Sequence, residues 1–241
     1  MLTAIGPRPT PRRIVAWRHA ASLADVARRH AGVARRRGAA LLVVAGLAGC
    51  GSSRELPPAA GPDRSPPLAR QPAGRVVPLA EAPGGDAGVR AVVDAGRKLA
   101  VVRPTERTLE LFDRATGERL ASAPAGAGPT RVVAGERGLA YVIDTAGDGL
   151  LVFETHGRLR ILRRYPLLGA PYGVAADLDA GRLWITLTAR NELLELATSA
   201  RPHLLDRHPT VRQPNEVAVG PDGVVVRGET QAQVLAPRRT R

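Results

Sequence analysis

The chain has 241 residues, enough for one large domain or two small ones, and carries a formal net charge of +13. Residues 1–49 hold nine arginines and one acidic residue, so that segment accounts for +8 and the rest of the chain for +5. In the rest of the chain, basic and acidic residues are interspersed rather than gathered into a stripe, which argues against a nucleic-acid partner. The single cysteine, Cys50, excludes an internal disulfide and a cysteine-based metal site.

An export signal is predicted at the amino terminus. Three arginines, at 35–37, come before the apolar run AALLVVAGLA at 39–48, which is too short to span a bilayer. We therefore predict that residues 1–49 form a signal peptide. Because residues 1–32 make this signal unusually long, we hypothesise that synthesis starts near Val33. The alternative is a long n-region with a short amphipathic helix at 22–37.

At the end of the apolar run, Leu47, Ala48, Gly49 and Cys50 resemble the lipobox of bacterial lipoproteins. The resemblance implies that the thiol of Cys50 takes a diacylglycerol, that the preceding peptide is removed, and that the new amino group is acylated, with chains such as palmitate. Two or three acyl chains would hold the protein stably at the extracytoplasmic face of the cell membrane. A buried strand that ends in a core cysteine is the alternative.

Residues 50–74 are predicted to be a lipidated cysteine followed by a spacer. The segment 51–74 contains six prolines, no aromatic residue and no apolar periodicity. Such a composition cannot bury a core and favours an extended chain. We expect it to hold a folded domain, at 75–237, away from the membrane, and we assign 238–241 to a tail.

The folded domain is predicted from a repeat. Similar segments restart at Leu99, Leu139, Leu183 and Val224, which are 40, 44 and 41 residues apart. A period in the low forties with strand-like content is typical of a propeller blade.

Each repeat resolves into four short strands between turn residues. In one copy these strands are expected at 172–177, 183–188, 192–196 and 202–206. Phe112, Phe153 and Leu196 occupy matching places in the third strand and are expected to pack between blades.

The motifs PNEVAVGPDG at 214–223 and LFDRATG at 111–117 resemble YVTN-type and NHL-type β-propeller repeats. The resemblance covers about residues 74–237. We therefore expect an all-β fold, a small β-propeller of about four four-stranded blades.

The two ends of the domain are expected to share a blade. The last copy supplies three strands, at 216–219, 224–227 and 231–236, and a lone outermost strand at about 75–79 supplies the fourth. This pairing would close the ring and leave no free sheet edges. An open arc of blades, or two chains joined into a larger ring, are the alternatives.

Ligands of propellers usually meet the ends of the innermost strands around the central channel. The candidate ligand-binding residues at those positions are Asp86, Arg131, Tyr172, Asn215 and Glu216, which could recognise a polar ligand or a peptide. Ordinary loop residues that satisfy turns are the alternative. We expect the side chains of the histidines at 156, 203 and 208 to be solvated, because none has metal-ligand spacing. No metal, cofactor or catalytic residue is predicted.

The sequence thus predicts a membrane-anchored, extracytoplasmic β-propeller lipoprotein that is not an enzyme and acts as a binding or scaffolding module. Its expected partners are the membrane and an envelope protein, peptide or small polar ligand, and not nucleic acid. The alternative is a small propeller hydrolase or lyase, similar to gluconolactonases or quinoproteins, with its site at the channel.

Overall fold

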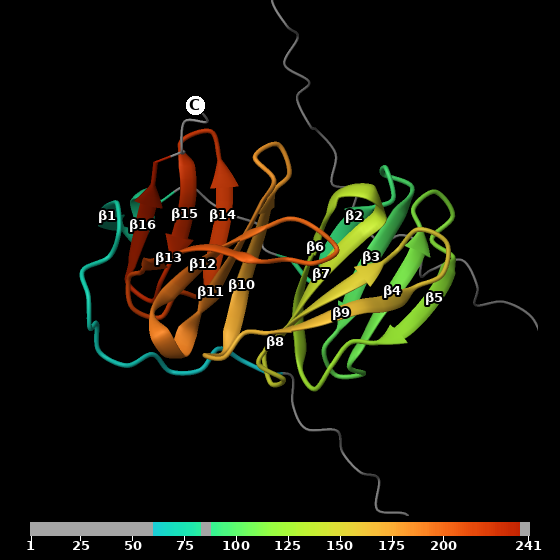
Figure 1. Cartoon of the computed structure of the whole chain (residues 1–241), viewed down its shortest axis with the longest axis horizontal. Helices are drawn as coiled ribbons and strands as arrows, with labels where there is room; N and C mark the ends of the chain where they lie inside the picture. The colour runs from blue at the N-terminus through green and yellow to red at the C-terminus, as the bar shows by residue number, and fades with distance from the viewer. Residues whose placement is uncertain (1–59, 83–87, 237–241) are drawn as a thin grey trace, which may run out of the picture. The chain divides into compact units, whose positions relative to one another are not determined.

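The computed structural model describes residues 60–82 and 88–236. The chain divides into two units, Met1–Ser52 and Ser53–Arg241, and the described residues all belong to the second. They form strands β1 to β16, arranged as four antiparallel sheets of four strands (Figure 1), with three short 3-10 turns. The 3-10 turns are η2 (Leu79–Glu81), η3 (Glu136–Gly138) and η4 (Thr188–Arg190). The predicted all-β fold is confirmed.

Three of the sheets are meanders in which neighbouring strands follow one another along the chain. Sheet I consists of β2 (Arg90–Val93), β3 (Lys98–Arg103), β4 (Thr108–Asp113) and β5 (Arg119–Pro124). Sheet II consists of β6 (Pro129–Ala134), β7 (Leu139–Asp144), β8 (Gly149–Glu154) and β9 (Arg160–Pro166). Sheet III consists of β10 (Pro171–Asp177), β11 (Arg182–Leu187), β12 (Glu192–Ala197) and β13 (Leu204–Pro209).

Sheet IV is assembled from the two ends of the domain, as predicted. It consists of β14 (Glu216–Gly220), β15 (Gly223–Arg227), β16 (Gln231–Leu235) and β1 (Arg75–Pro78). Strand β1 pairs antiparallel with β16, so that Arg75 lies opposite Val234 and Pro78 opposite Gln231. Pro78 is tolerated because β1 is an edge strand, where a missing N–H costs no ladder hydrogen bond.

One expected strand lies further along the chain than the sequence indicated. The outermost strand of sheet III was expected at 202–206 and is found at Leu204–Pro209. The backbone N–H of Ala197 donates to the carbonyl oxygen of His203, and that of Thr198 to Gly181. These bonds keep the intervening residues in a turn, so that β13 begins later.

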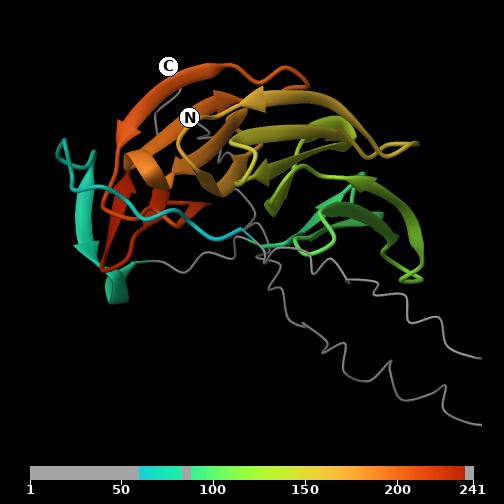
Figure 2. The same cartoon turned by 90° about the horizontal axis from the view of Figure 1, so that it is seen from below.

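The four innermost strands, β2, β6, β10 and β14, each contact the next in this order and together line one cavity, which we call the channel. Figure 2 shows sheets IV, III, II and I in succession along an arc. Three buried apolar clusters hold neighbouring sheets together. The first, which contains Val102, Leu151 and Phe153, joins sheets I and II. The second, around Ile185 and Leu196, joins sheets II and III, and the third, around Trp184 and Val226, joins sheets III and IV.

The junction between sheets IV and I differs from the other three. Strands β14 and β2 contact each other less than any other successive pair of innermost strands, and no buried apolar cluster joins these two sheets within residues 60–82 and 88–236. The pairing registers explain the difference. Arg90 and Glu110 of sheet I occupy the places that Val132 and Leu151 fill in sheet II. A face that carries these charges does not need to be buried against a neighbour.

The prediction for Phe112 is corrected for the same reason. Its counterparts Phe153 and Leu196 are fully buried between sheets, as predicted. Phe112 is only half-buried on the charged face of sheet I, where the guanidinium of Arg103 lies 6.0 Å from the centre of its ring. Glu110 on this face is paired with Arg103 and Arg119 at 3.0 Å each.

The expected spacer, 50–74, is described from residue 60 onward, and there it lies against the sheets. Ser65 is buried, and its hydroxyl donates to the carbonyl oxygen of Thr188. Two more bonds link it to Gln213, one from its backbone N–H to Oε1 at 2.8 Å and one from the Gln213 N–H to Oγ at 3.1 Å. Asn191 donates to the carbonyl oxygen of Pro66 at 2.9 Å. The idea that all of this segment stands away from the domain is therefore corrected for 60–74. A proline-rich segment needs no core of its own when folded sheets supply hydrogen-bond partners.

Candidate functional site

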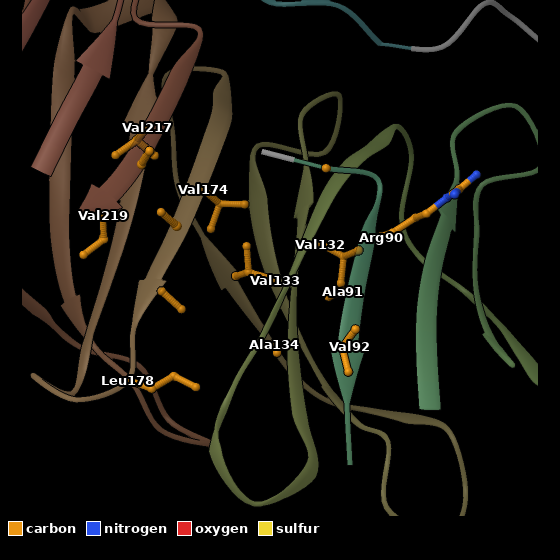
Figure 3. Close-up of a pocket in the computed structure, with 14 residues that line it drawn as sticks. Arg90, Ala91, Val92, Val132, Val133, Ala134, Val174, Leu178, Val217 and Val219 are labelled. Atoms are coloured by element: carbon orange, nitrogen blue, oxygen red, sulfur yellow. The ribbon is translucent and has the colours of Figure 1, made fainter. Parts of the chain in front are cut away.

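The channel between the innermost strands is a cavity of about 450 Å³ that is lined mostly by apolar side chains (Figure 3). Equivalent positions of three repeats contribute Val132, Val174 and Val217 to its wall. Each of these valines follows a proline-containing entry to its strand, which places the three at one level of the channel. Apart from Arg90, the side chains of the wall are apolar, so the other polar side chains available for recognition are those at the ends of the channel.

The structure brings together most of the predicted site residues at the end where the innermost strands begin. The guanidinium of Arg131, on β6, lies 4.9 Å from the centre of the Tyr172 ring, on β10, which is within range of a cation–π interaction. Gly173 follows directly, and a side chain there would press against the backbone of Asn215 and Glu216. Residues of sheets II, III and IV therefore form one continuous band, which we call the channel mouth (Arg131, Tyr172, Asn215 and Glu216). Asp86 lies outside the described residues.

Hydrogen bonds at the first residues of β6 and β10 position these side chains. The hydroxyl of Thr130 lies 2.8 Å from that of Thr145, which donates to the carbonyl oxygen of Pro171 at 2.8 Å. The N–H of Gly173 donates to the hydroxyl of Thr186 at 2.8 Å. These bonds tie the start of β6 to the start of β10 and thereby fix Arg131 over Tyr172.

Two carboxylates near the mouth hold backbone loops. Asp144 accepts hydrogen bonds from the N–H groups of Ala127, Gly128 and Gly147, and Asp148 accepts from those of Gly169 and Ala170. Because both carboxylates serve the loops that enter β6 and β10, they act in positioning the mouth.

Glu216 has a charged neighbour of its own. Its Oε2 lies 3.3 Å from Nε of Arg227, and Arg227 also donates to the carbonyl oxygen of Ala82 at 3.1 Å. On the other side, the amide of Gln213 donates to Oδ1 of Asn215 at 3.3 Å and to the carbonyl oxygen of Asp63 at 2.6 Å. The segment 60–74 therefore borders the mouth, along the lower edge of the sheets in Figure 1.

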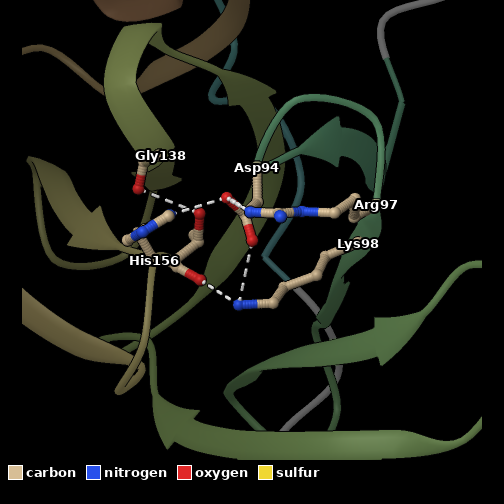
Figure 4. Close-up of polar contacts among 6 residues, drawn as sticks. Asp94, Arg97, Lys98, Gly138 and His156 are labelled. Atoms are coloured by element: carbon tan, nitrogen blue, oxygen red, sulfur yellow. Dashed lines mark hydrogen bonds and ion pairs between the residues drawn. The ribbon is translucent and has the colours of Figure 1, made fainter.

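At the opposite end of the channel, Asp94 links sheets I and II (Figure 4). Its carboxylate lies 2.7 Å from Nδ1 of His156, 2.9 Å from Arg97 and 3.2 Å from Lys98. Lys98 also donates to the carbonyl oxygen of Thr155 at 2.8 Å, across the junction of the two sheets. Sequence reasoning missed this cluster, because its members come from turns of two different repeats.

Asp94 makes the stability of the protein sensitive to acid. The hydrogen bond from His156, followed by those from Arg97 and Lys98, holds the pKa of Asp94 well below its ordinary value, although burial opposes the shift. A lowered carboxyl pKa stabilises the fold above its unfolded-state value of about 3.9, and this contribution is lost as the pH falls below that value. We expect Asp94→Asn to lower the urea midpoint at pH 7, and the gap from wild type to narrow between about pH 4 and pH 2. The exposed Asp179→Asn is the control, and a gap that stays constant with pH would contradict this role.

The expectation that the histidine side chains are solvated is wrong for His208 and holds for His156 and His203. His156 contacts Asp94, although most of its side chain is exposed. The side chain of His208 is only 14% exposed and lies 3.2 Å from Glu195. Strand pairing places His208 beside Glu195, and the packing of sheets I and II places His156 beside Asp94. Spacing along the chain shows neither contact. His203 is exposed, as expected.

The predicted lipobox, 47–50, lies outside the described residues, as do the signal peptide and the tail. Among residues 60–82 and 88–236, no helix is long and apolar enough to cross a membrane.

No protein-family model matches the sequence, and no curated protein matches it. Solved structures do match it, and three of them each align with about 60% of this chain. A hydrazine synthase of Kuenenia stuttgartiensis is 17% identical over 61% of this chain and 58% of its own, with a TM-score of 0.51. A Bacteroides uniformis protein provisionally named a 6-phosphogluconolactonase is 13% identical over 58% of this chain and 46% of its own, with a TM-score of 0.51. A Desulfotomaculum acetoxidans protein of unknown function is 17% identical over 58% of this chain and 49% of its own, with a TM-score of 0.50.

The four sheets and these similarities define the class of protein, which is a β-propeller with four four-stranded blades. The chain spans about half the length of the solved structures that it matches.

The comparisons correct the expectation that the chain is not an enzyme. That expectation rested on the lack of a recognisable catalytic motif or metal-ligand spacing in the sequence. Chains that share the fold include one named as a hydrazine synthase and one provisionally named as a lactonase. A propeller fold is therefore no ground for excluding catalysis, and the function has to be argued from the site.

Proposed function

We propose that this chain is an extracytoplasmic propeller, anchored through a lipid on Cys50, which binds a small anionic ligand at the channel mouth. The observation that carries the proposal is the convergence of Arg131, Tyr172 and the pair Asn215 and Glu216 from three blades. Arg131 is a donor suited to a carboxylate or phosphate, Tyr172 offers a flat apolar face, and Asn215 adds an amide. A few convergent polar groups beside an apolar cavity are typical of a small-molecule site.

The ligand proposal is tested by titrating the full chain with D-gluconate and with inorganic phosphate in a calorimeter. We expect Arg131→Ala to weaken binding by about tenfold or more, because a hydrogen bond to a charged group is worth about 1.5–3 kcal/mol. Arg163→Ala, an exposed arginine on the outermost strand of sheet II, is the matched control and should bind as wild type does. If neither anion binds, or if Arg131→Ala binds equally well, the proposed ligand class is wrong.

A second function, the opening of a sugar lactone at the same mouth, is favoured by the fold shared with the provisionally named 6-phosphogluconolactonase. In this reaction the carboxylate of Glu216 takes a proton from water as the oxygen adds to the lactone carbonyl. The ring C–O bond then breaks, and the proton passes to the leaving alkoxide, which gives the hydroxy acid. Arg131 would hold the anionic part of the substrate.

Hydrolysis of 6-phospho-D-glucono-1,5-lactone, whose phosphate is the anionic part, is followed by base consumption at constant pH and tests this second function. We expect Glu216→Gln to retain binding of gluconate within a few-fold and to lose the hydrolysis above the uncatalysed rate. A wild-type rate equal to that of buffer would overturn the lactonase proposal and leave the binding proposal to its own test.

The anchor is tested in living cells by metabolic labelling with an alkyne analogue of palmitate. We expect the wild-type chain to carry the label and to sediment with membranes, since each buried methylene contributes about 0.8 kcal/mol. Cys50→Ser should lose the label and the membrane association together. Labelling that survives this substitution would contradict the lipid anchor. An envelope protein or peptide as a further partner remains a prediction.

A further inference from the structure

Away from the channel, a second cavity of about 310 Å³ lies between sheets III and IV. One wall is apolar and comes from sheet IV, with Val219, Val224 and Leu235. The opposite wall is the face of sheet III that is turned toward sheet IV, and it carries polar side chains. These are Arg182, Trp184, Glu195 and His208.

The register of sheet III brings three metal-ligating side chains to one point. Glu195 on β12 lies directly opposite Asp206 on β13, and His208 lies two residues further along β13, on the same face. The Nε2 atom of His208 lies 3.2 Å from Oε2 of Glu195 and 3.9 Å from Oδ2 of Asp206. One ligand atom from each residue lies within 4.8 Å of the other two.

The two separations from Nε2 of His208, 3.2 and 3.9 Å, lie on either side of the value expected for two ligands of one ion. With bonds of about 2.0–2.2 Å to a tetrahedral Zn²⁺, two ligand atoms lie about 3.4 Å apart. One imidazole and two carboxylates are ligands that Zn²⁺ accepts, and three protein ligands leave a fourth position open. Ca²⁺ fits poorly, because it takes six or more oxygen ligands and no imidazole.

The surroundings support a bound ion. Glu195 is only 1% exposed, and its Oε1 accepts a hydrogen bond from Nε of Arg182 at 2.9 Å. That bond orients the carboxylate and directs Oε2 toward His208. Hydrogen bonds of this kind fix metal ligands in many proteins.

An independent observation points to a ligand in the same cavity. Trp184 lines it, is only 6% exposed, and has its ring centre 5.7 Å from that of His208. Its indole N–H is buried and has no hydrogen-bond partner among the described residues. A buried donor without an acceptor costs about 1–3 kcal/mol. A water, hydroxide or carboxylate bound to the ion would supply that acceptor.

We propose that Glu195, Asp206 and His208 form a Zn²⁺ site that opens onto the cavity between sheets III and IV. The sequence predicted no metal, because positions 195, 206 and 208 show no metal-ligand spacing. The site is separate from the channel mouth and does not depend on the proposed function. The competing interpretation is an ion-pair network in which a protonated His208 bridges the two carboxylates.

The experiment titrates Zn²⁺ into the full chain, with Cys50→Ser as background so that the thiol cannot bind the ion. We expect one site per chain, and His208→Ala should weaken binding by at least about tenfold. His203→Ala removes an exposed histidine of the neighbouring loop and should leave binding unchanged. His208→Ala keeps Glu195 paired with Arg182, so no buried charge is left alone. Asp206→Asn, at a more exposed position, is the second variant should the first fail to fold.

Trp184 supplies a local readout. With Trp17→Phe added to the background, Trp184 is the only tryptophan, and Co²⁺ bound at this site should quench its emission. Added Zn²⁺ should compete with Co²⁺ and reverse the quenching. His208→Ala and Asp206→Asn should each abolish it. Absence of Zn²⁺ binding, or equal binding by wild type, His208→Ala and Asp206→Asn, would overturn the site in favour of the ion-pair network.

Discussion

Replacing Phe153 by alanine should lower the free energy of unfolding by about 3–5 kcal/mol, the usual cost of removing a large aromatic side chain from a packed core. Phe153 lies on β8, is fully buried, and packs with Val102 and Leu151 in the cluster that joins sheets I and II. A domain is typically stable by only about 5–15 kcal/mol, so the variant should be close to unfolding. Urea denaturation followed by circular dichroism measures the change.

The matched control is Leu168→Ala. Leu168 is 64% exposed, so its loss should change stability by less than about 0.5 kcal/mol. An equal effect of the two substitutions would mean that Phe153 does not lie between two sheets.

Replacing Asp144 by alanine should destabilise the protein by about 1–3 kcal/mol. The buried carboxylate accepts hydrogen bonds from three backbone N–H groups, those of Ala127, Gly128 and Gly147. The N–H of Gly128 is buried, so the loss of its acceptor costs about 1–3 kcal/mol, whereas Ala127 and Gly147 are exposed and their N–H groups can bond to water instead. Because Ala127 and Gly128 lead into the strand that carries Arg131, binding at the channel mouth should weaken as well. Chemical denaturation and anion titration measure the two effects.

A conservative variant and an exposed control are compared with Asp144→Ala. Asp144→Asn keeps one acceptor oxygen and should lose less stability than the alanine variant. Asp222→Ala, in an exposed turn of sheet IV, should behave like wild type. If Asp144→Ala is as stable as Asp222→Ala, the carboxylate does not hold the loops that enter β6.

The repeat in the sequence was sufficient to predict the four sheets and the shared fourth blade. Apolar residues that return every forty or so positions, between Pro, Gly and Asp turns, report strand periodicity directly. The loose junction between sheets IV and I was harder to foresee. Arg90 and Glu110 interrupt the apolar pattern, but only the strand register shows that they occupy the places of a buried valine and leucine.

The candidate site was predictable in part. Arg131, Tyr172, Asn215 and Glu216 start equivalent strands, so the repeat alone indicated that they share one end of the channel. The contacts of residues 60–74 depend on Ser65, Asn191 and Gln213, which no repeat relates to one another. The cluster at Asp94 and the one at Glu195 arise from cross-strand and inter-sheet neighbours. Chain spacing contains no signal for either.

The pairing of β1 with β16 is the central claim, because it completes the sheet that holds Asn215 and Glu216. It is tested most directly by a disulfide between Arg75→Cys and Val234→Cys, which lie opposite each other in the register, in the Cys50→Ser chain. We expect the oxidised monomer to lose two hydrogens in its intact mass and to gain stability. The pair Arg75→Cys and Gln231→Cys lies three residues out of register, about 10 Å apart, and should not form a bond. A bond in the mismatched pair, or bonds only between two chains, would contradict a fourth blade built from the two ends of one domain.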